Sequence, residues 1–459
     1  MSIDTTKKVV SIKVDGVSMP MDSGGGSTIV AAELPNNVLK LYSGATLLDT
    51  KTVTTAPVEF SVSENGTYTV KAYDTSNNEL WTKDVVVDEI GVYTCKSGKA
   101  LTNYTKEEIH TLLQNGLFST MFSYGDKWKF VQSGSLFNNL DFFVEKITKS
   151  NGKEIVDFRA VAGASSTYNI FPQMSYITSS SASSWTKTRY SYGGYKYSAM
   201  RQRMMKQGED VYSQATGILP DDYSGSLATG VKFSDLKYSD TGLTCPIYSY
   251  SSSADTMTQL NAPLTAAPSN TAMMFIKGYF KSVGAIDETT FNNGVYYIFD
   301  STNLVYTKAT SFASGTTYYG LYEKMQEDGI FVSALSSLSD YLVRFSESAS
   351  AGGTQTSTVS SFGDYVDIPA VEEITGINRT KTLFSGASAT SINAYNLANE
   401  GTKKPAYDAF DKQAIGYDYW TRSAYTTGTN YFCYIYSSGS INYSFVNNSN
   451  RARIGFRLQ

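Results

Sequence analysis

The chain has 459 residues, a formal net charge of −4 and no cluster of basic residues, so it lacks the electrostatic footprint of a nucleic-acid-binding protein. Its length is enough for roughly two to four domains. The three cysteines are far apart and there is a single histidine, His110, which leaves little material for a metal site or for acid–base chemistry. We therefore expect no metal, no other cofactor and no nucleic-acid partner.

The N-terminal sequence MSIDTTKKVVSIKVDG contains no apolar core of a signal peptide. No later run approaches the roughly 18 apolar residues that a membrane-spanning helix needs. The sequence therefore predicts a protein that is made in a cytoplasm without a signal peptide and does not insert into a membrane.

Residues 1–92 show apolar residues in alternation with polar ones, for example at Val58, Phe60 and Val62. Turn sequences separate these runs: SGAT at 43–46, ENGT at 64–67 and the pair Asn77–Asn78 are each expected to close a hairpin. Some seven short strands in this length predict an all-β sandwich of immunoglobulin type without a disulfide. Such a module is typical of a spacer or a docking unit.

The pattern after Cys95 changes to mixed helix and strand, and we treat 96–459 as a second domain. Thr105 and Glu108 form a capping box at the start of a helix over 105–115, which ends before Gly116. His110 lies beside the solvated face of this helix, so a structural role is expected. Further helices are predicted from Ser198 onward and at 320–328, 334–342 and 388–399. A β-meander is predicted at 290–322, inside an insertion at about 246–340.

The C-terminal segment 417–459 combines many Tyr, Ser, Asn and Thr residues with few charges. Tyrosine offers a large, stiff contact area, and Ser, Gly and Asn offer adaptable hydrogen bonds, as in antibody loops. The segment is therefore typical of a binding surface, although an ordinary β-meander has a similar composition.

Several short motifs follow one another in an order that resembles one family. They are GLFSTMFSYGDKWKF, GGYKYSAMRQRMMKQGEDVYSQATGILPDDYSG, DYVDIPAVEEITG, YDYWTRSAY and RARIGFRL. The family is a domain of unknown function in gut bacteria and phages, with a C-type-lectin-like fold related to formylglycine-generating enzymes. The resemblance implies an α+β C-type-lectin-like domain with a β-rich insertion behind the immunoglobulin-like sandwich.

Two activities are known in this superfamily. The oxidases use a pair of cysteines near the C-terminus, whereas Cys433 stands alone here and has no histidine or basic residue nearby to lower its pKa. We therefore expect no oxidase and no enzyme.

The other activity is ligand display, as in the diversity-generating variable proteins. Those proteins vary their binding residues by adenine-directed mutagenesis of AAC or AAT codons, which cannot produce Lys, Glu, Gln, Met or Trp. These five residue types are absent from residues 425–450, which favours the hypothesis that this segment is diversified in the same way. The alternative is an ordinary uncharged β-meander, which would lack the same residue types.

The resemblance divides the segment into scaffold and contact residues. The scaffold residues are expected to be Trp420, Arg422, Arg453 and Phe456, with Arg451, Arg453 and Arg457 alternating with core residues along one terminal strand. The ligand-binding residues are expected to be exposed: Tyr425, Asn430, Tyr431, Tyr434, Tyr436, Asn442, Tyr443, Phe445, Asn447 and Asn448.

The sequence as a whole predicts a bacteriophage virion protein, a tail or head fibre or spike that recognises a glycan or protein on the host surface. Its N-terminal module would contact other virion proteins, and a homotrimer is the expected assembly. Three alternatives stay open: a structural decoration or collar protein, a bacterial surface adhesin, and a depolymerase. The last would need a pair of acids such as Asp221 and Asp222 or Glu372 and Glu373.

Overall fold

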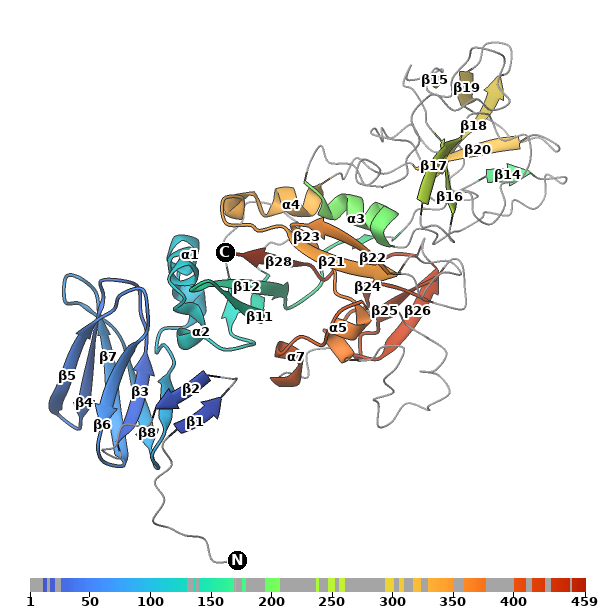
Figure 1. Cartoon of the computed structure of the whole chain (residues 1–459). Coiled ribbons are helices and arrows are strands. Elements are labelled where there is room, and N and C mark those ends of the chain that lie inside the picture. Colours follow the sequence, from blue (N-terminus) through green and yellow to red (C-terminus); the bar gives the residue numbers. More distant parts are fainter. Residues whose placement is uncertain are drawn as a thin grey trace, which may run out of the picture. The chain divides into compact units, whose positions relative to one another are not determined.

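The structure, a computed structural model, describes part of the chain. The described residues are 11–14, 17–20, 26–129, 136, 140–168, 170, 176–178, 195–206, 237–238, 247–251, 256–260, 294–300, 305–308, 317–322, 329–350, 359–376, 400–409, 415–425, 431–445 and 448–459. The chain forms two compact units. The first comprises Met1–Phe130, Ile147–Val156 and Gln459, and the second comprises Val131–Lys146 and Asp157–Leu458. Strands dominate both units, which confirms the predicted β-rich fold (Figure 1).

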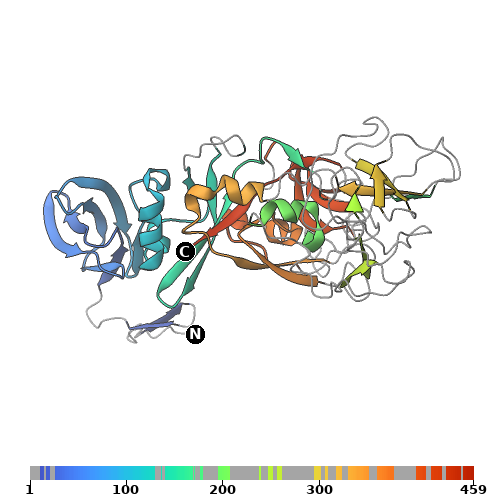
Figure 2. The ribbon, with the colours of Figure 1, turned by 90° about the horizontal axis from the view of Figure 1, so that it is seen from above.

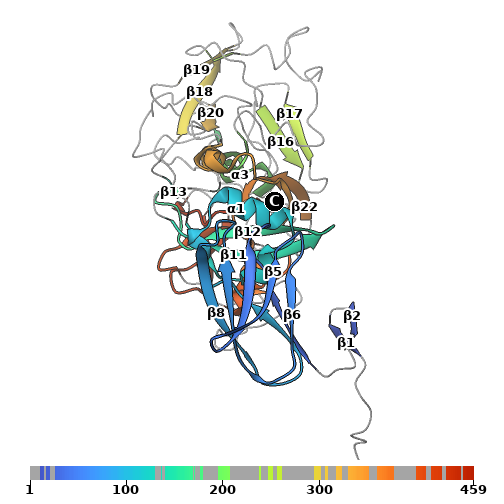
Figure 3. The ribbon, with the colours of Figure 1, turned by 90° about the vertical axis from the view of Figure 1, so that its left-hand side faces the viewer.

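The first unit contains two sheets. Their strands are β3 (Ser27–Ala31), β4 (Val38–Ser43), β5 (Thr46–Thr52), β6 (Val58–Val62), β7 (Gly66–Tyr73), β8 (Glu79–Val87) and β9 (Val92–Cys95). One sheet has the order β6-β3-β9, with β3 and β9 parallel, and the other has the antiparallel order β5-β4-β7-β8. A separate hairpin pairs β1 (Ser11–Val14) with β2 (Val17–Pro20). Figure 3 shows the blue strands of this unit running side by side.

Two of the three predicted hairpin turns are confirmed. SGAT closes the β4–β5 hairpin, where Gly44 has a φ of 57°, and Asn77, with a φ of 64°, lies in the β7–β8 turn. The prediction for ENGT at 64–67 is wrong. It joins β6 to β7, which lie in different sheets, so it is a crossing connection instead of a hairpin. Alternation predicts strands but does not say which strands pair.

The buried carboxylate of Glu33 joins the sheets of the first unit to the segment that follows them in the sequence. Glu33 accepts a hydrogen bond from the Trp81 indole and another, 3.1 Å long, from the hydroxyl of Tyr104. The indole of Trp128 in turn donates to the carbonyl of Tyr104 at 3.1 Å. Burying a carboxylate is costly unless donors surround it, so these aromatic donors make Glu33 tolerable inside the core.

The predicted helix of this unit is confirmed as α1 (Lys106–Gln114). Its capping box joins Thr105 and Glu108, and Ile109, Leu112 and Leu113 are buried. The elements around it are η1 (Leu101–Asn103), α2 (Phe118–Met121) and β10 (Lys127–Trp128). His110 is half-buried, and its Nδ1 lies 2.7 Å from the carbonyl oxygen of Gln459.

The second unit is built around two sheets. Their strands are β11 (Phe142–Ser150), β12 (Lys153–Ala160), β13 (Thr167–Tyr168), β23 (Val366–Asp367), β24 (Tyr419–Ala424), β25 (Tyr431–Ile435), β26 (Ile441–Phe445), β27 (Asn450–Arg451) and β28 (Gly455–Leu458). One sheet has neighbours in the order β11-β12-β28-β23, and the other has the order β13-β27-β24-β25-β26. The outer end of the β11–β12 hairpin, residues 147–156, belongs to the first unit.

Short helices and a further hairpin complete the described part of this unit. They are η2 (Tyr195–Tyr197), α3 (Ala199–Met204), α4 (Ile330–Ala334), η4 (Ser336–Leu338), α5 (Val371–Thr375), α7 (Ala406–Ala409) and the pair β21 (Phe345–Ser350) and β22 (Val359–Asp364). Helices α3 and α4 lie side by side, in green and orange in Figure 2.

Five described strands lie within the predicted insertion at about 246–340: β16 (Ile247–Ser251), β17 (Thr256–Leu260), β18 (Gly294–Asp300), β19 (Val305–Lys308) and β20 (Thr317–Tyr322). Two further strands, β14 (Tyr176–Thr178) and β15 (Lys237–Tyr238), precede it in the sequence. The sheet order is β14-β20-β18-β19-β15, so β18 lies between β19 and β20 and the predicted simple meander is corrected.

The helix predictions in the second unit hold only in part. Residues 320–322 belong to strand β20 instead of a helix, because the Tyr-rich run pairs with β18. The helix expected at 334–342 begins earlier, as α4, and continues as the 3₁₀ turn η4. The helix from Ser198 is present as α3, and the helix expected at 388–399 lies outside the described residues.

The single terminal strand predicted from the alternation of arginines is two strands, β27 and β28. Ile454, Phe456 and Leu458 are buried as expected. Arg453 is also completely buried, so the alternation of outward and inward residues fails there.

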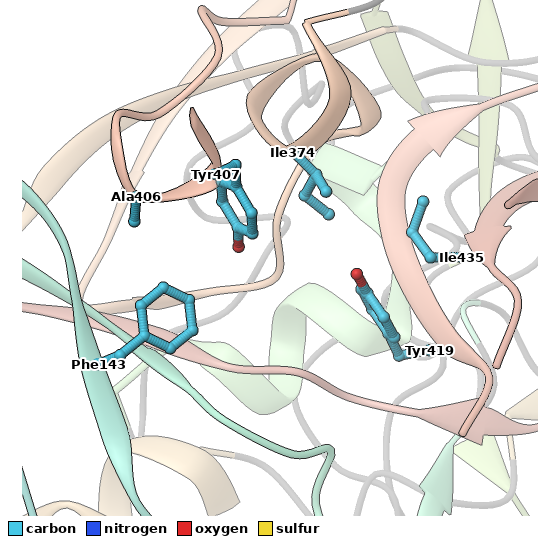
Figure 4. Close-up of a cluster of buried hydrophobic side chains, with 6 residues drawn as sticks. All are labelled: Phe143, Ile374, Ala406, Tyr407, Tyr419 and Ile435. Atoms are coloured by element: carbon cyan, nitrogen blue, oxygen red, sulfur yellow. The ribbon is translucent and has the colours of Figure 1, made fainter. Parts of the chain in front are cut away.

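A hydrophobic cluster lies at the centre of the second unit, between α5, α7 and both sheets (Figure 4). Its buried members are Phe143, Ile374, Ala406, Tyr407, Tyr419 and Ile435. Because Tyr419 and Ile435 belong to β24 and β25, this cluster fixes the inner side of the C-terminal sheet. Among the described helices, none has the length and apolarity to span a bilayer.

Candidate ligand-binding surface

The Tyr-rich segment forms the antiparallel strands β24, β25 and β26. Trp420 pairs with Tyr434, which pairs in turn with Asn442 on β26. In the same ladder Cys433 pairs with Tyr443 and Tyr431 pairs with Phe445. Successive residues of a strand point to opposite faces. The predicted binding residues are therefore divided between two faces of one sheet.

The first face carries what we call the aromatic cluster: Tyr425, Tyr431, Tyr443 and Phe445. The rings of Tyr425 and Tyr443 are stacked with centroids 4.1 Å apart and an interplanar angle of 7°. Tyr431 meets Tyr443 edge to face at 5.3 Å and stacks on Phe445 at 4.5 Å. Such ring pairs each contribute about 0.5–1.5 kcal/mol beyond their buried area, so these contacts stabilise the arrangement of the four rings.

The base of the aromatic cluster is buried and its outer part is exposed. Tyr425 is only 8% exposed and packs with Val371 of α5 and with Cys433. Tyr443 is 41% exposed, and Tyr431 and Phe445 are half-buried. The cluster therefore presents aromatic rings to solvent, with no charged side chain among its own members.

The opposite face, which we call the Tyr434 face, consists of Tyr434, Tyr436 and Asn442. Tyr434 meets Trp420 edge to face at 6.0 Å, and the Trp420 indole donates to the carbonyl of Tyr168 at 2.7 Å. Tyr434 is 9% exposed, whereas Tyr436, next to it at a ring distance of 6.4 Å, is 44% exposed. Tyr434 is therefore buried against Trp420, and Tyr436 is the exposed ring of this face.

The structure therefore corrects two of the predicted contact residues: Tyr425 and Tyr434 were expected to be exposed and are buried. Their rings fill the space between the strands and the elements beneath them. Asn442 is half-buried, and Asn448 is exposed and donates to the Ser444 hydroxyl at 2.7 Å. Asn430 and Asn447 lie outside the described residues.

The four predicted scaffold residues are buried. Trp420, Arg422, Arg453 and Phe456 are all at most 2% exposed. Arg453 donates to the Ala160 carbonyl at 2.9 Å and to the Tyr419 hydroxyl at 3.2 Å. Phe456 meets Phe142 edge to face at 5.0 Å.

Arg422 is the centre of a buried ionic network that holds β24. It lies 2.8 Å from Glu373 Oε1, 3.4 Å from Asp367 Oδ2 and 3.3 Å from Glu347 Oε1. It also donates to the Ile368 carbonyl at 2.8 Å. These contacts tie β24 to α5, β23 and β21, and so they set the position of the sheet that bears the tyrosines.

The network continues away from Arg422 through Asp367. Arg159 lies 2.8 Å from Asp367 and forms a two-bond pair with Glu145 at 3.0 and 3.1 Å. Lys404 donates to Glu145 at 2.7 Å. Burial opposes ionisation of Glu145, but Arg159 and Lys404 outweigh it and lower the pKa of Glu145 to about 2.

Glu347 differs from the other acids of this network. Its Oε2 is buried and has no hydrogen-bond partner among the described residues. Burial raises the pKa of Glu347 well above its ordinary value; Arg422 opposes this rise, and Asp367 adds to it. For Asp367, burial is outweighed by Arg159 and by a hydrogen bond with Glu347, which lower its pKa. The raised pKa favours the protonated form of Glu347, in which the carboxyl group can donate a hydrogen bond toward Asp367.

The residues considered for chemistry have structural contacts. Glu372 Oε2 accepts from the backbone of Glu400 at 2.8 Å and of Gly401 at 3.1 Å. Glu373 Oε2 accepts from the Ala370 N–H at 3.0 Å, as a helix cap does. Cys433 is buried in β25, and burial raises the pKa of its thiol well above the ordinary value. Asp221 and Asp222 lie outside the described residues.

One polar residue at the Tyr434 face was missed by the sequence analysis. Asp418 precedes β24, and its Oδ1 accepts a hydrogen bond of 2.9 Å from the Ser437 N–H. Only its position before an aromatic strand could have suggested it. The network acids Glu145, Glu347 and Asp367 were missed as well, because they lie far apart in the sequence and meet only in the folded unit.

In the described part of the chain, no group of three or more His, Cys, Asp and Glu side chains is placed to hold a metal ion. Comparisons with protein-family models, with curated proteins and with solved structures find no match.

Proposed function

We propose that the protein is a bacteriophage virion component, a tail or head fibre or spike, which recognises the host surface through its uncharged aromatic C-terminal sheet. The observation that carries the proposal is the aromatic cluster. Tyr443 is exposed at its outer end, Tyr425 and Tyr431 hold its ring in place, and Phe445 stacks on Tyr431. Rigid aromatic rings that present contact area at little entropic cost are typical of recognition surfaces.

We further propose that the first unit is an immunoglobulin-like docking module that contacts other virion proteins. Two facing groups of strands, β6-β3-β9 and β5-β4-β7-β8, support this assignment. For the second unit we propose the C-type-lectin-like fold. The order of its sequence motifs supports it, as does the closing strand β28, which lies beside the early strand β12.

The proposed assembly is a homotrimer in the virion. Single contacts of a small aromatic surface are weak, and several copies on one particle add about 10² to 10⁴ in avidity over one site. Labelling of purified phage particles with antibodies against the protein, viewed by electron microscopy, tests its presence and place on the particle. Particles without label would contradict the virion assignment.

Binding of the fluorescently labelled full chain to candidate host cells tests recognition directly. We expect saturable binding, and we expect Tyr443→Ala to weaken it about tenfold, because one well-placed aromatic contact is worth about 1–2 kcal/mol. Tyr124→Ala is the matched control, since Tyr124 is 37% exposed in the first unit and lies outside the proposed surface.

Circular dichroism of each variant establishes that it is folded. Equal binding by the Tyr443 and Tyr124 variants would remove the aromatic cluster from the recognition surface. No binding by the folded wild-type protein to any host would favour the alternative, a structural decoration or collar protein.

A further inference from the structure

We infer that the Tyr434 face carries a separate subsite for a neutral hexopyranose, formed by the ring of Tyr436, the carboxylate of Asp418 and the amide of Asn442. This inference rests on the proposed function, since it names the ligand class of a surface proposed for recognition. The subsite is distinct from the aromatic cluster because it lies on the opposite face of the same strands.

The three groups are brought together around Tyr434. Asn442 pairs directly with Tyr434 across β25 and β26, and Tyr436 follows the last residue of β25, with its ring 6.4 Å from that of Tyr434. The ladder between β24 and β25 ends at the pair Tyr419 and Ile435, and Asp418 and Tyr436 are the residues next to that pair in the sequence. Burial raises the pKa of Tyr434, and the nearby Asp418 and Tyr436 raise it further. Asp418 and Tyr436 therefore both lie beside Tyr434.

In each of the two polar side chains, one atom accepts a hydrogen bond from the backbone and the other is available to a ligand. Asp418 Oδ1 accepts from the Ser437 N–H at 2.9 Å, and Asn442 Oδ1 accepts from the Tyr443 N–H at 2.8 Å. Among the described residues, Asp418 Oδ2 and Asn442 Nδ2 have no hydrogen-bond partner. The subsite thus offers one anionic acceptor and one neutral donor, both held in position by backbone groups.

The ring of Tyr436 is available for stacking. Its nearest described aromatic neighbour, Tyr434, is tilted by 52° at 6.4 Å, in contrast to the closely stacked Tyr425 and Tyr443 of the aromatic cluster. The turn behind it is rigid, because the Tyr436 N–H donates to the Ser440 carbonyl at 2.7 Å and the Gly439 N–H donates to the Tyr436 carbonyl at 2.8 Å.

These features select a neutral sugar over other ligands. The C–H face of a pyranose packs on an aromatic ring, and its neighbouring hydroxyls donate to a carboxylate and accept from an amide. An acidic sugar would be repelled by Asp418. One ring with two polar groups matches one sugar residue, whereas a protein epitope needs about 800 Å² on each partner.

Saturation-transfer NMR with the full chain tests the subsite. The probes are D-galactose, D-glucose, D-mannose and N-acetyl-D-glucosamine, with D-glucuronic acid as the charged comparison. We expect transfer to the ring protons of at least one neutral sugar and none to the acid. Tyr436→Ala should weaken binding about tenfold. Tyr436→Phe should retain most of it, because the ring remains.

Two further variants complete the experiment. Asp418→Asn removes the charge and should weaken sugar binding, while Tyr417→Ala is the matched control, because Tyr417 is an equally exposed tyrosine that stacks with Arg451 instead. Absence of transfer to all four neutral sugars would overturn the inference, as would transfer that Tyr436→Ala leaves unchanged.

The result is separable from the test of the proposed function. Host-cell binding that depends on Tyr443, without sugar binding at Tyr436, would retain surface recognition and reject the sugar subsite. Sugar binding that depends on Tyr436, without any host-cell binding, would retain the subsite and reject the proposed function.

Discussion

At the scale of single residues, the second unit depends on buried charges more than on its exposed tyrosines. Arg422 contacts three carboxylates and three backbone carbonyls while being almost completely buried. Removing one partner of such a group leaves uncompensated charge in the interior.

We therefore expect Arg422→Met to lower the free energy of unfolding of the second unit by about 3–5 kcal/mol. Urea unfolding followed by tryptophan fluorescence measures the loss. Arg451→Met is the matched control, because Arg451 is only half-buried and stacks on the exposed Tyr417. A loss below about 1 kcal/mol for Arg422→Met would show that the network is replaceable by packing.

The protonation of Glu347 predicts a specific pH dependence. The pKa of Glu347 is raised in the folded state, so its contribution to stability is complete below the unfolded pKa of about 4.3. That contribution is lost as the pH rises toward the folded value. The groups around it are Arg422, Asp367, Glu373 and Tyr195.

Glu347→Gln keeps a hydrogen-bond donor toward Asp367 but cannot ionise. Above pH 4.3, the variant should gain stability relative to the wild type by about 1.4 kcal/mol for each pH unit, until the folded pKa is reached. Urea unfolding of both proteins between pH 5 and pH 8 measures this difference. A difference that stays constant over that range would mean that Glu347 is already ionised at pH 5.

At the scale of elements, the turn between β25 and β26 sets the position of Tyr436. Gly439 has a φ of 93°, a conformation that a residue with a Cβ rarely adopts. We expect Gly439→Ala to cost about 1 kcal/mol or more and to speed hydrogen exchange of the amides in β25 and β26.

Gly66→Ala is the control for this prediction. Gly66 lies in β7, its φ is not in the left-handed region, and a Cβ added there would meet no atom within 4 Å. Exchange in β25 and β26 should be unchanged in that variant. Equal exchange in the two variants would show that the turn does not depend on its glycine.

The elements also show which features of the fold could be predicted from the sequence alone. Alternation and turn residues predicted most strands of the first unit, and the Thr105–Glu108 capping box predicted α1, because those signals are local. The face of each Tyr on β24 to β26 was not predictable. It depends on the strand register and on what packs beneath, and this is why Tyr425 and Tyr434 are buried against expectation.

At the scale of the whole molecule, each compact unit has its own core and its own buried cysteine. Cys95 lies in the first unit and Cys433 in the second. Burial raises the pKa of Cys95 to about 12, against a smaller lowering by Lys83 and with a smaller rise from Asp84, and burial raises the pKa of Cys433 as well. Neither thiol should react with iodoacetamide in the native protein.

Alkylation during urea unfolding, resolved by mass spectrometry, therefore follows each unit separately. We expect Arg422→Met to lower the urea midpoint for Cys433 labelling and to leave that for Cys95 unchanged. The labelling of Cys95 in the same sample is the internal control. Equal shifts at both cysteines would mean that the units unfold as one.

The side chains of β25 point alternately to the two faces of the sheet, and this has a consequence for natural variation. A substitution at Tyr436 or Tyr443 changes one face only, whereas a one-residue insertion or deletion within β25 would exchange the two faces and remove Cys433 and Ile435 from the hydrophobic clusters that they form with α5. Natural variants of this protein should therefore differ by substitutions in these strands. Differences in length should be confined to the turn at residues 437–440, where no ladder partner is displaced.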